Sequence, residues 1–420
     1  MVSYLNVFKV KELRKKLFSI VVILAVFRLM ASIPVPGVDV ERLKNLFNSN
    51  QLLGFLDVFS GSGLSNLSIV MLGVGPYITA TIIMQLLTMV FPNLKKLYYE
   101  EGEIGKAKFN RVCRYLTVPL SVVQSYGFLN FLAAKGVLVA MTKADMFFDI
   151  LLITAGSVAL MWLGELISEY KLGNGISLLI FAGIVSSIPQ NIKLAISSFT
   201  SAMAQSYLIF LITAIVVIAG VVFVNEGERK IPISYARRVR GNKLFGGVSS
   251  YLPLKVNQAG VIPIIFAISV LLFPQFIAQA ASVFSTDLSV KMNDMVLAVF
   301  NNLWIYSIIY FILVVAFTYF YTAITFDPEE ISKNLQRNGG FIPGLRPGEQ
   351  TSKFLSKIIN RTTLFGSLFL GAIAVLPNAL SGITGVSFMT IGGTALLIVV
   401  SVALEIMRQI ESQLVVRQYE

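Results

Sequence analysis

The stretch GVGPYITATIIMQLL, Gly73–Leu87, lies within a long apolar segment, yet its first four residues include two glycines and a proline. Proline fixes φ and removes a backbone donor, and glycine permits unusual backbone or a close helix contact. We therefore expect the helix to be broken at Gly73–Pro76, and close packing is the simplest reason for such a break. Val74, Ile78 and Ile82 are spaced four residues apart and share one helical face.

The composition is that of a polytopic helical membrane protein. Of the 420 residues, 55% are hydrophobic and 13% are charged, and the mean hydropathy is +0.77. Several segments approach or exceed the roughly 18 apolar residues that a membrane helix needs. These segments are continuously apolar and do not alternate with polar residues, which argues against a membrane β-barrel.

We expect the chain to cross the membrane through helices along its whole length. The basic N-terminus resembles a signal peptide, but Arg28 interrupts the apolar run and no clear cleavage site follows, so the first span is expected to be retained. The ten predicted spans are Leu17–Ile33, Ile69–Val90, Tyr115–Ala134, Phe147–Leu166, Ile176–Ile192, Tyr207–Val224, Ala259–Ala278, Trp304–Phe326, Ile359–Leu376 and Gly392–Ile410.

The distribution of Lys and Arg predicts the orientation. Most of them lie in the two terminal segments and in every second loop, which places both termini in the cytoplasm. The external segment around Ser197–Ser206 divides the chain into two halves of five spans, residues 1–200 and 201–420. An odd number of spans in each half inverts one half relative to the other. This symmetry rests on counting, because the halves share no visible sequence identity.

The residue inventory argues against several classes of function. The chain has no His and a single cysteine, Cys113, which excludes Ser-His-Asp catalysis, His-ligated metals and an intramolecular disulfide. Charged residues of the spans, such as Arg28, Glu165 and Glu405, lie near span ends. An ion-driven transporter or lipid flippase would need a central polar site, and an intramembrane enzyme would need catalytic groups. We predict no catalytic residue, no metal site and no cofactor.

Three further features stay open when the residues alone are considered. Gln85 and Gln124 lie within spans and more often join helices than bind a substrate. The glycine-rich Gly54–Ser68 is too short to span, so it is either an interfacial turn or a re-entrant segment. A second aliphatic face usually meets lipid or another helix, and it consists of Ile176, Ile180 and Ile184.

Two long cytoplasmic loops, residues 225–257 and 326–358, are rich in Lys and Arg. Topology alone accounts for some of this charge but does not require loops of this length. Basic loops suit an acidic partner such as lipid, nucleic acid or an acidic protein face. Docking of a partner and plain anchoring are therefore equally good interpretations of the loops.

Several long motifs closely resemble the bacterial SecY family, the channel subunit of the protein translocase. The similarity covers essentially the whole chain, with the same order of ten spans. The motifs are GPYITATIIMQLLT (Gly75–Thr88), MWLGELISEYKLGNGISLLIFAGIV (Met161–Val185), LPLKVNQAGVIP (Leu252–Pro263), FIPGLRPGEQT (Phe341–Thr351) and GGTALLIVV (Gly392–Val400). The resemblance implies an all-α fold with two inverted five-helix halves around a central pore. It also implies a protein-conducting channel in the cytoplasmic membrane that opens both across the membrane and sideways into lipid.

The resemblance further implies roles for individual residues. A plug is expected at residues 54–67, including Leu56, Phe59, Gly61, Gly63 and Leu64. A lateral gate is expected at Thr79, Gln124 and Phe273. Docking of a motor or ribosome is expected at Arg238, Arg240, Lys243 and Arg346. A hydrophobic pore ring is expected at Val74, Ile78, Ile176, Ile180, Ile265 and Ile398.

The partners implied are SecE and SecG-type small subunits, the SecA motor ATPase, the ribosome, precursor polypeptides with signal sequences, and membrane lipid. The chain has no Walker pattern, so a partner must supply the energy. One departure affects docking: the family often has paired basic residues after a glycine of the sixth loop, where Gly241 is followed here by Asn242 and Lys243.

In such a channel, the break at Gly73–Pro76 separates the plug from the helix that carries part of the pore ring. An aliphatic ring forms a narrow, dry constriction that excludes hydrated ions and offers no hydrogen bonds to a passing chain. The break frees the preceding segment to act as a movable plug, and Gly61 and Gly63 lower the cost of its movement. We expect the apolar side chains of this plug, Leu56, Phe59 and Leu64, to pack beneath the ring.

Overall fold

The computed structural model describes residues 10–36, 57, 60–61, 63–64, 66–99, 101–134, 136–138, 142–197, 204–235, 238–240, 243–245, 249–281, 291–292, 295–296, 298, 302–384 and 388–418. The first half of the chain contains helices α1 (Lys11–Ala31), α4 (Gly75–Val90), α5 (Pro92–Tyr99), α6 (Gly102–Ala134), α7 (Lys143–Glu169) and α8 (Gly175–Ser197). The second half contains helices α9 (Ala204–Glu226), α10 (Ile262–Ala280), α12 (Leu303–Thr325), α13 (Pro328–Arg337), α14 (Glu349–Thr384) and α15 (Phe388–Gln418).

The predicted spans fall on these helices. By length and composition, five helices of the described chain are apolar enough to cross a membrane, and a sixth span results if the bent pair α4 and α5 counts as one. Shorter apolar stretches, Gly175–Pro189 and Ile262–Leu271, lie in α8 and α10. Both of these helices contain a proline, Pro189 and Pro274 respectively.

Local chemistry accounts for where the helices begin. Helix α4 starts at Gly75, two residues after Gly73 with its φ of +57°, and Pro76 occupies its first turn. Proline is tolerated in that turn because the first backbone donors have no partner within the helix. The predicted break at Gly73–Pro76 is therefore confirmed. Helix α7 begins with a capping box, in which Thr142 and Asp145 satisfy each other's backbone N–H groups.

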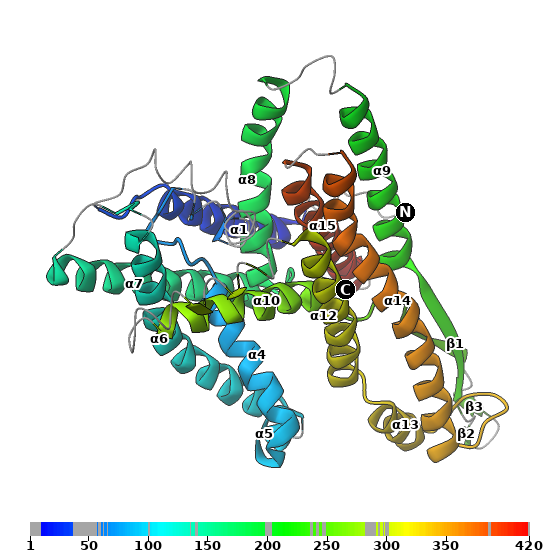
Figure 1. The fold of residues 1–420 in the computed structure, drawn as a ribbon. Coiled ribbons are helices and arrows are strands. Elements are labelled where there is room, and N and C mark those ends of the chain that lie inside the picture. The colour runs from blue at the N-terminus through cyan, green and yellow to red at the C-terminus, as the bar shows by residue number, and fades with distance from the viewer. Residues whose placement is uncertain are drawn as a thin grey trace.

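The helices of each half pack together, and two helices carry contacts between the halves. Helix α10 contacts α12 in its own half and both α4 and α6 in the first half (Figure 1). Helix α15 contacts α9 and α14 in its own half and α8 in the first. One large cluster of buried aliphatic and aromatic side chains joins α1 and α7 with α4, α8, α9, α10, α12, α14 and α15. The centre of the molecule is therefore built by α4, α8, α10 and α15.

The basic loops contain β-structure, which the sequence-based expectation of an all-α fold did not include. Strand β1 (Glu228–Tyr235) pairs antiparallel with β4 (Ser249–Lys255), and β5 (Gly340–Phe341) joins its other edge. Two short strands, β2 (Arg238–Arg240) and β3 (Lys243–Phe245), pair beyond them. Figure 1 shows this ribbon extending beside the end of α14.

Alternation of side chains explains why the ribbon folds back on the helices. Ile231 and Ile233 are buried while their neighbours in β1 are more exposed, as expected for a strand with one covered face. Ile231 packs in a cluster with Leu254 of β4 and with Leu355 and Ile358 of α14. The ribbon and the loop carrying β5 thus form one apolar unit on α14.

Candidate functional site

The six residues expected to form the pore ring come from the four central helices. Val74 and Ile78 lie at the start of α4, Ile176 and Ile180 on α8, Ile265 on α10 and Ile398 on α15. Five of them are buried members of one hydrophobic cluster, and the half-buried Ile176 packs against it. The cluster also extends to α1, α9, α12 and α14, so it is larger than a ring. The structure thus brings the six side chains into one apolar region.

The plug residues are placed in part. Leu56 and Phe59 lie outside the described residues, whereas Gly61, Gly63 and Leu64 are described. Leu64 is buried with Leu67 and with side chains of α6 and α7. That cluster is separate from the one holding the ring residues, and the packing of the plug beneath the ring stays a prediction.

Hydrogen bonds join the segment before α4 to the residues that follow α1. The N–H of Val35 donates to the carbonyl of Leu67 at 2.8 Å, and the N–H of Ile69 donates to the carbonyl of Ile33 at 3.0 Å. Within the segment, the Ser60 hydroxyl accepts from the N–H of Leu64 at 2.9 Å. The described residues of this segment thus form turns that are bonded to the residues following α1.

The expected lateral-gate residues lie on three helices that contact one another, α4, α6 and α10. Thr79 and Gln124 are buried, and Phe273 is 38% exposed. The Thr79 hydroxyl donates to the carbonyl of Gly75 at 3.0 Å, so its hydrogen bond stays within α4. Gln124 places a buried side-chain amide on α6, among these three helices.

The expected docking residues lie at the tips of the two basic loops. Arg346 is exposed between β5 and α14, in a loop where Gly344 and Gly348 have φ values of +83° and +99°. The Thr351 hydroxyl donates to the carbonyl of Arg346 at 3.0 Å and closes this loop. The backbones of Arg238, Arg240 and Lys243 lie in β2 and β3, with Arg240 paired opposite Lys243.

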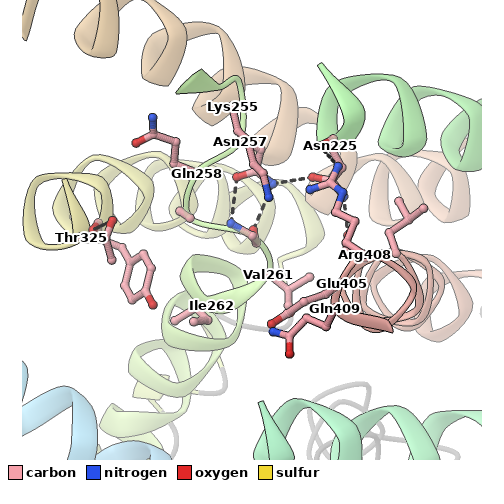
Figure 2. Close-up of a pocket in the computed structure, with 15 residues that line it drawn as sticks. Asn225, Lys255, Asn257, Gln258, Val261, Ile262, Thr325, Glu405, Arg408 and Gln409 are labelled. Atoms are coloured by element: carbon pink, nitrogen blue, oxygen red, sulfur yellow. Dashed lines mark hydrogen bonds between the residues drawn. The ribbon is translucent and has the colours of Figure 1, made fainter. Parts of the chain in front are cut away.

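A polar cavity that sequence reasoning missed lies where α9, α10, α12 and α15 meet (Figure 2). It has a volume of about 310 Å³, and Lys255, Gln258, Glu405 and Arg408 are among its lining residues. Arg408 forms an ion pair with Glu226 through Nε and Oε1 at 2.9 Å. The only sequence signal for this site was a set of polar residues at the ends of apolar spans.

An asparagine network forms one wall of this cavity (Figure 2). The amide of Asn257 donates to the side-chain carbonyl of Asn225 at 2.7 Å, and Asn225 donates to the Ser401 hydroxyl at 3.1 Å. Asn257 also accepts from the N–H of Gly260 at 3.1 Å. These bonds join the end of α9 to the segment before α10 and to α15.

Partial burial lowers the pKa of the Lys255 ammonium, and the positive charge of Arg408 lowers it further. The carboxylates of Glu226, Glu228 and Glu405 act in the opposite direction. Lys255, which lines the cavity, is therefore influenced by charges of both signs.

Comparison with known proteins gives consistent results at the levels of sequence and fold. The family model described as SecY matches residues 68–407. The protein translocase subunit SecY of Corynebacterium glutamicum is 41% identical, with 100% of this chain and 99% of the relative covered.

Two solved structures share the fold. One is described as a protein-conducting channel, with a TM-score of 0.65, 21% identity and coverage of 94% of this chain and 90% of that chain. In the other, the plug domain of the SecY protein is described as stabilising the closed state of the translocation channel and maintaining a membrane seal. It has a TM-score of 0.62 and 22% identity, and 93% of this chain and 90% of that chain are covered. The match of the family model and the full-length similarity establish that the chain belongs to the SecY family.

Proposed function

We propose that this chain is a protein-conducting channel of the bacterial cytoplasmic membrane. It passes unfolded secretory proteins across the membrane and releases signal sequences and membrane segments sideways into lipid. The observation that carries this proposal is the convergence of Val74, Ile78, Ile180, Ile265 and Ile398, from four helices and both halves of the chain, in one buried aliphatic region.

The proposed ring blocks ions because its side chains carry no charged or polar groups. Aliphatic side chains offer neither charge nor hydrogen bonds, so a hydrated ion loses its water shell without compensation. A polypeptide of any sequence finds no group that holds it. Side chains such as Ile78 and Ile265 can change rotamer as residues of different size pass. The ring thereby combines low selectivity for the passing chain with a barrier to ions.

The glycine-rich residues 54–67 are the proposed plug, and they precede the break at the start of α4. Because α4 begins only at Gly75, this segment can move without unwinding that helix. Gly61 and Gly63 supply the conformational freedom for the movement. The plug described for a SecY protein of the same fold supports this role.

The proposed lateral gate is the seam formed by α4, α6 and α10, with Thr79, Gln124 and Phe273 on its helices. A hydrophobic segment gains free energy when it moves from water into lipid, while a polar chain does not. Opening the seam lets each segment partition according to its hydrophobicity. Mutual contact of these three helices supports the assignment.

The proposed orientation has both termini in the cytoplasm, with residues 1–200 and 201–420 as the two inverted halves. SecE and SecG-type subunits are the proposed membrane partners. The SecA motor or a translating ribosome would dock on the basic loops through Arg238, Arg240, Lys243 and Arg346. The chain itself acts as a conduit and not as an enzyme, so the energy comes from these partners.

Site-specific photocrosslinking tests the channel. A photoreactive residue is placed in turn at Ile78, Ile180 and Ile265, and a secretory precursor is stalled halfway through. We expect the precursor to crosslink at each position and not at Ile215, a 59% exposed residue of α9. If the precursor crossed the membrane without crosslinking at any of the three, the proposed path through these residues would be wrong.

A further inference from the structure

Gly61, within the proposed plug, lies in a tight seat between α1 and α8. A β-carbon on Gly61 would lie 2.5 Å from Cζ of Phe27 and 3.1 Å from the Cα of Gly183. Conversely, a β-carbon on Gly183 would overlap the Cα of Gly61. The two glycines therefore touch through their backbones, and no side chain can be accommodated on the facing side of either one.

The backbone of Gly61 also requires glycine for a second reason. Its φ is +66°, in the left-handed region that residues with a β-carbon rarely adopt. The plug backbone thus turns sharply at the point where it touches α8. A turn that is both left-handed and in direct backbone contact fixes the position of the plug, because a chain shifted by one residue would bring a serine to Gly183.

Arg28 of α1 also holds this turn, opposite the contact with α8. Its Nη1 donates a 2.7 Å hydrogen bond to the carbonyl of Gly61. The carboxylate of Asp57, four residues before Gly61, interacts electrostatically with the same guanidinium. Arg28 is the one charged residue in the predicted span Leu17–Ile33, where a charge is costly unless it has a partner. Its partner here is the plug.

The seat is linked to the proposed pore ring through α8. Ile180 and Gly183 are three residues apart and so lie about one turn apart on the same side of that helix. A side chain that pushes Ile180 outward therefore moves the surface that holds Gly61. Arg28 lies on α1, so the contact with Gly61 is also sensitive to any separation of α1 from α8.

We propose, on the basis of the proposed channel function, that Arg28, Gly61 and Gly183 form a latch that keeps the plug closed. Displacement of Ile180 by an entering polypeptide separates α8 from Gly61 and breaks the backbone contact. The hydrogen bond from Arg28 to Gly61 then remains as the last contact that holds the plug. It returns the plug to its closed position when the polypeptide has passed. Arg28 and Gly183 are thus positioning residues for the plug and do not touch the passing chain.

The test uses the full chain with Cys113 replaced by alanine and Ser60→Cys as a reporter beside Gly61. Ser60 is 2% exposed, so its cysteine is expected to react slowly with a membrane-impermeant maleimide in the closed state. Arg28→Met is expected to raise the labelling rate about tenfold, as the loss of one hydrogen bond from a charged group implies. Gly183→Ala is expected to raise the labelling rate as well, because its methyl group overlaps the Cα of Gly61. Both variants are also expected to raise resting ion conductance. Arg28→Met adds no atom to the contact between Gly61 and Gly183. If the Gly183→Ala protein does not accumulate in the membrane, the result with Arg28→Met therefore decides whether the latch exists.

Two matched controls separate a latch from general damage. Gly220→Ala places a methyl 3.2 Å from the Phe369 ring in the contact of α9 with α14, and it should change neither labelling nor conductance. Arg28→Lys keeps a cationic donor and should return labelling toward the parent rate. Parent-like labelling and conductance in both Gly183→Ala and Arg28→Met would overturn the latch. Crosslinking of the precursor at Ile78, Ile180 and Ile265 tests the channel independently, so it would persist if only the latch were wrong.

Discussion

Asn257 donates a 2.7 Å hydrogen bond from its side-chain amide to the side-chain carbonyl of Asn225, across 32 positions of sequence. Both side chains are buried. The bond joins the C-terminal end of α9 to the segment that leads from β4 into α10 (Figure 2). This polar contact therefore joins the two ends of the ribbon formed by β1 and β4.

Replacement of Asn257 by alanine is expected to destabilise the protein. It would leave the amide partners on Asn225 and Gly260 unpaired in a buried site, at a cost of about 1–3 kcal/mol. Thermal unfolding of the purified protein in detergent measures the effect. The exposed Asn334→Ala on α13 is the control and should leave the midpoint unchanged. Equal midpoints for the two variants would show that the network contributes nothing.

Lys255 is expected to titrate below its ordinary value of 10.5, because partial burial and the charge of Arg408 both lower its pKa. The Arg408→Gln substitution should raise this pKa, and Glu226→Gln should lower it further. The folded state disfavours the charged form of Lys255, so the protein is destabilised at neutral pH. This destabilisation disappears as the pH rises from the folded-state pKa of Lys255 toward 10.5. NMR of the protein with ¹³C-dimethylated lysines follows the titration. Shifts of the same sign in both variants would contradict the assignment.

Ion leak tests the proposed ring. Ile78→Gly and Ile398→Gly each remove a large aliphatic side chain from the buried region, so resting conductance in a reconstituted bilayer should rise several-fold. Glycine in a helix also costs about 1 kcal/mol in helix propensity. Ile215→Gly on the exposed face of α9 carries the same cost and should not leak. Conductance at the parent level in both ring variants would refute the ring.

Gate polarity should set the threshold for signal sequences. Gln124→Leu replaces a buried amide on α6 with an apolar side chain, so less hydrophobic signal sequences should be accepted. A series of precursors with graded signal hydrophobicity measures the threshold. Val123→Leu, at a neighbouring position that is 47% exposed, is the control. An unchanged threshold in Gln124→Leu would remove this residue from the gate.

Arg346 tests the docking loops. Charge reversal by Arg346→Glu should slow motor-driven translocation about tenfold, because close charge pairs across interfaces are worth more than 1 kcal/mol. The side chain is exposed, so the stability of the protein should change little. Lys143→Glu, an exposed residue at the start of α7, serves as the control. A wild-type rate of motor-driven translocation in Arg346→Glu would show that Arg346 contributes only to membrane orientation and not to docking.

Local signals explain what could be predicted. The apolar segments predicted the helices, since hydropathy acts over about 20 consecutive residues. The glycines and proline of Gly73–Pro76 predicted the start of α4 for an equally local reason. Strands β1 and β4 were missed because their alternation is short and basic residues interrupt it. Their pairing, Ile231 opposite Leu252, joins residues whose proximity depends on the fold.

The sequence by itself determined the membrane class, the break before α4 and the absence of histidine chemistry, because these depend on composition and on neighbouring residues. Only the tertiary structure decided that Arg28 faces Gly61, that Gly61 touches Gly183, and that Leu64 packs with α6 and α7. Each of these contacts joins segments separated by tens of residues. Such contacts are selected by the packing of whole helices, which no local pattern specifies.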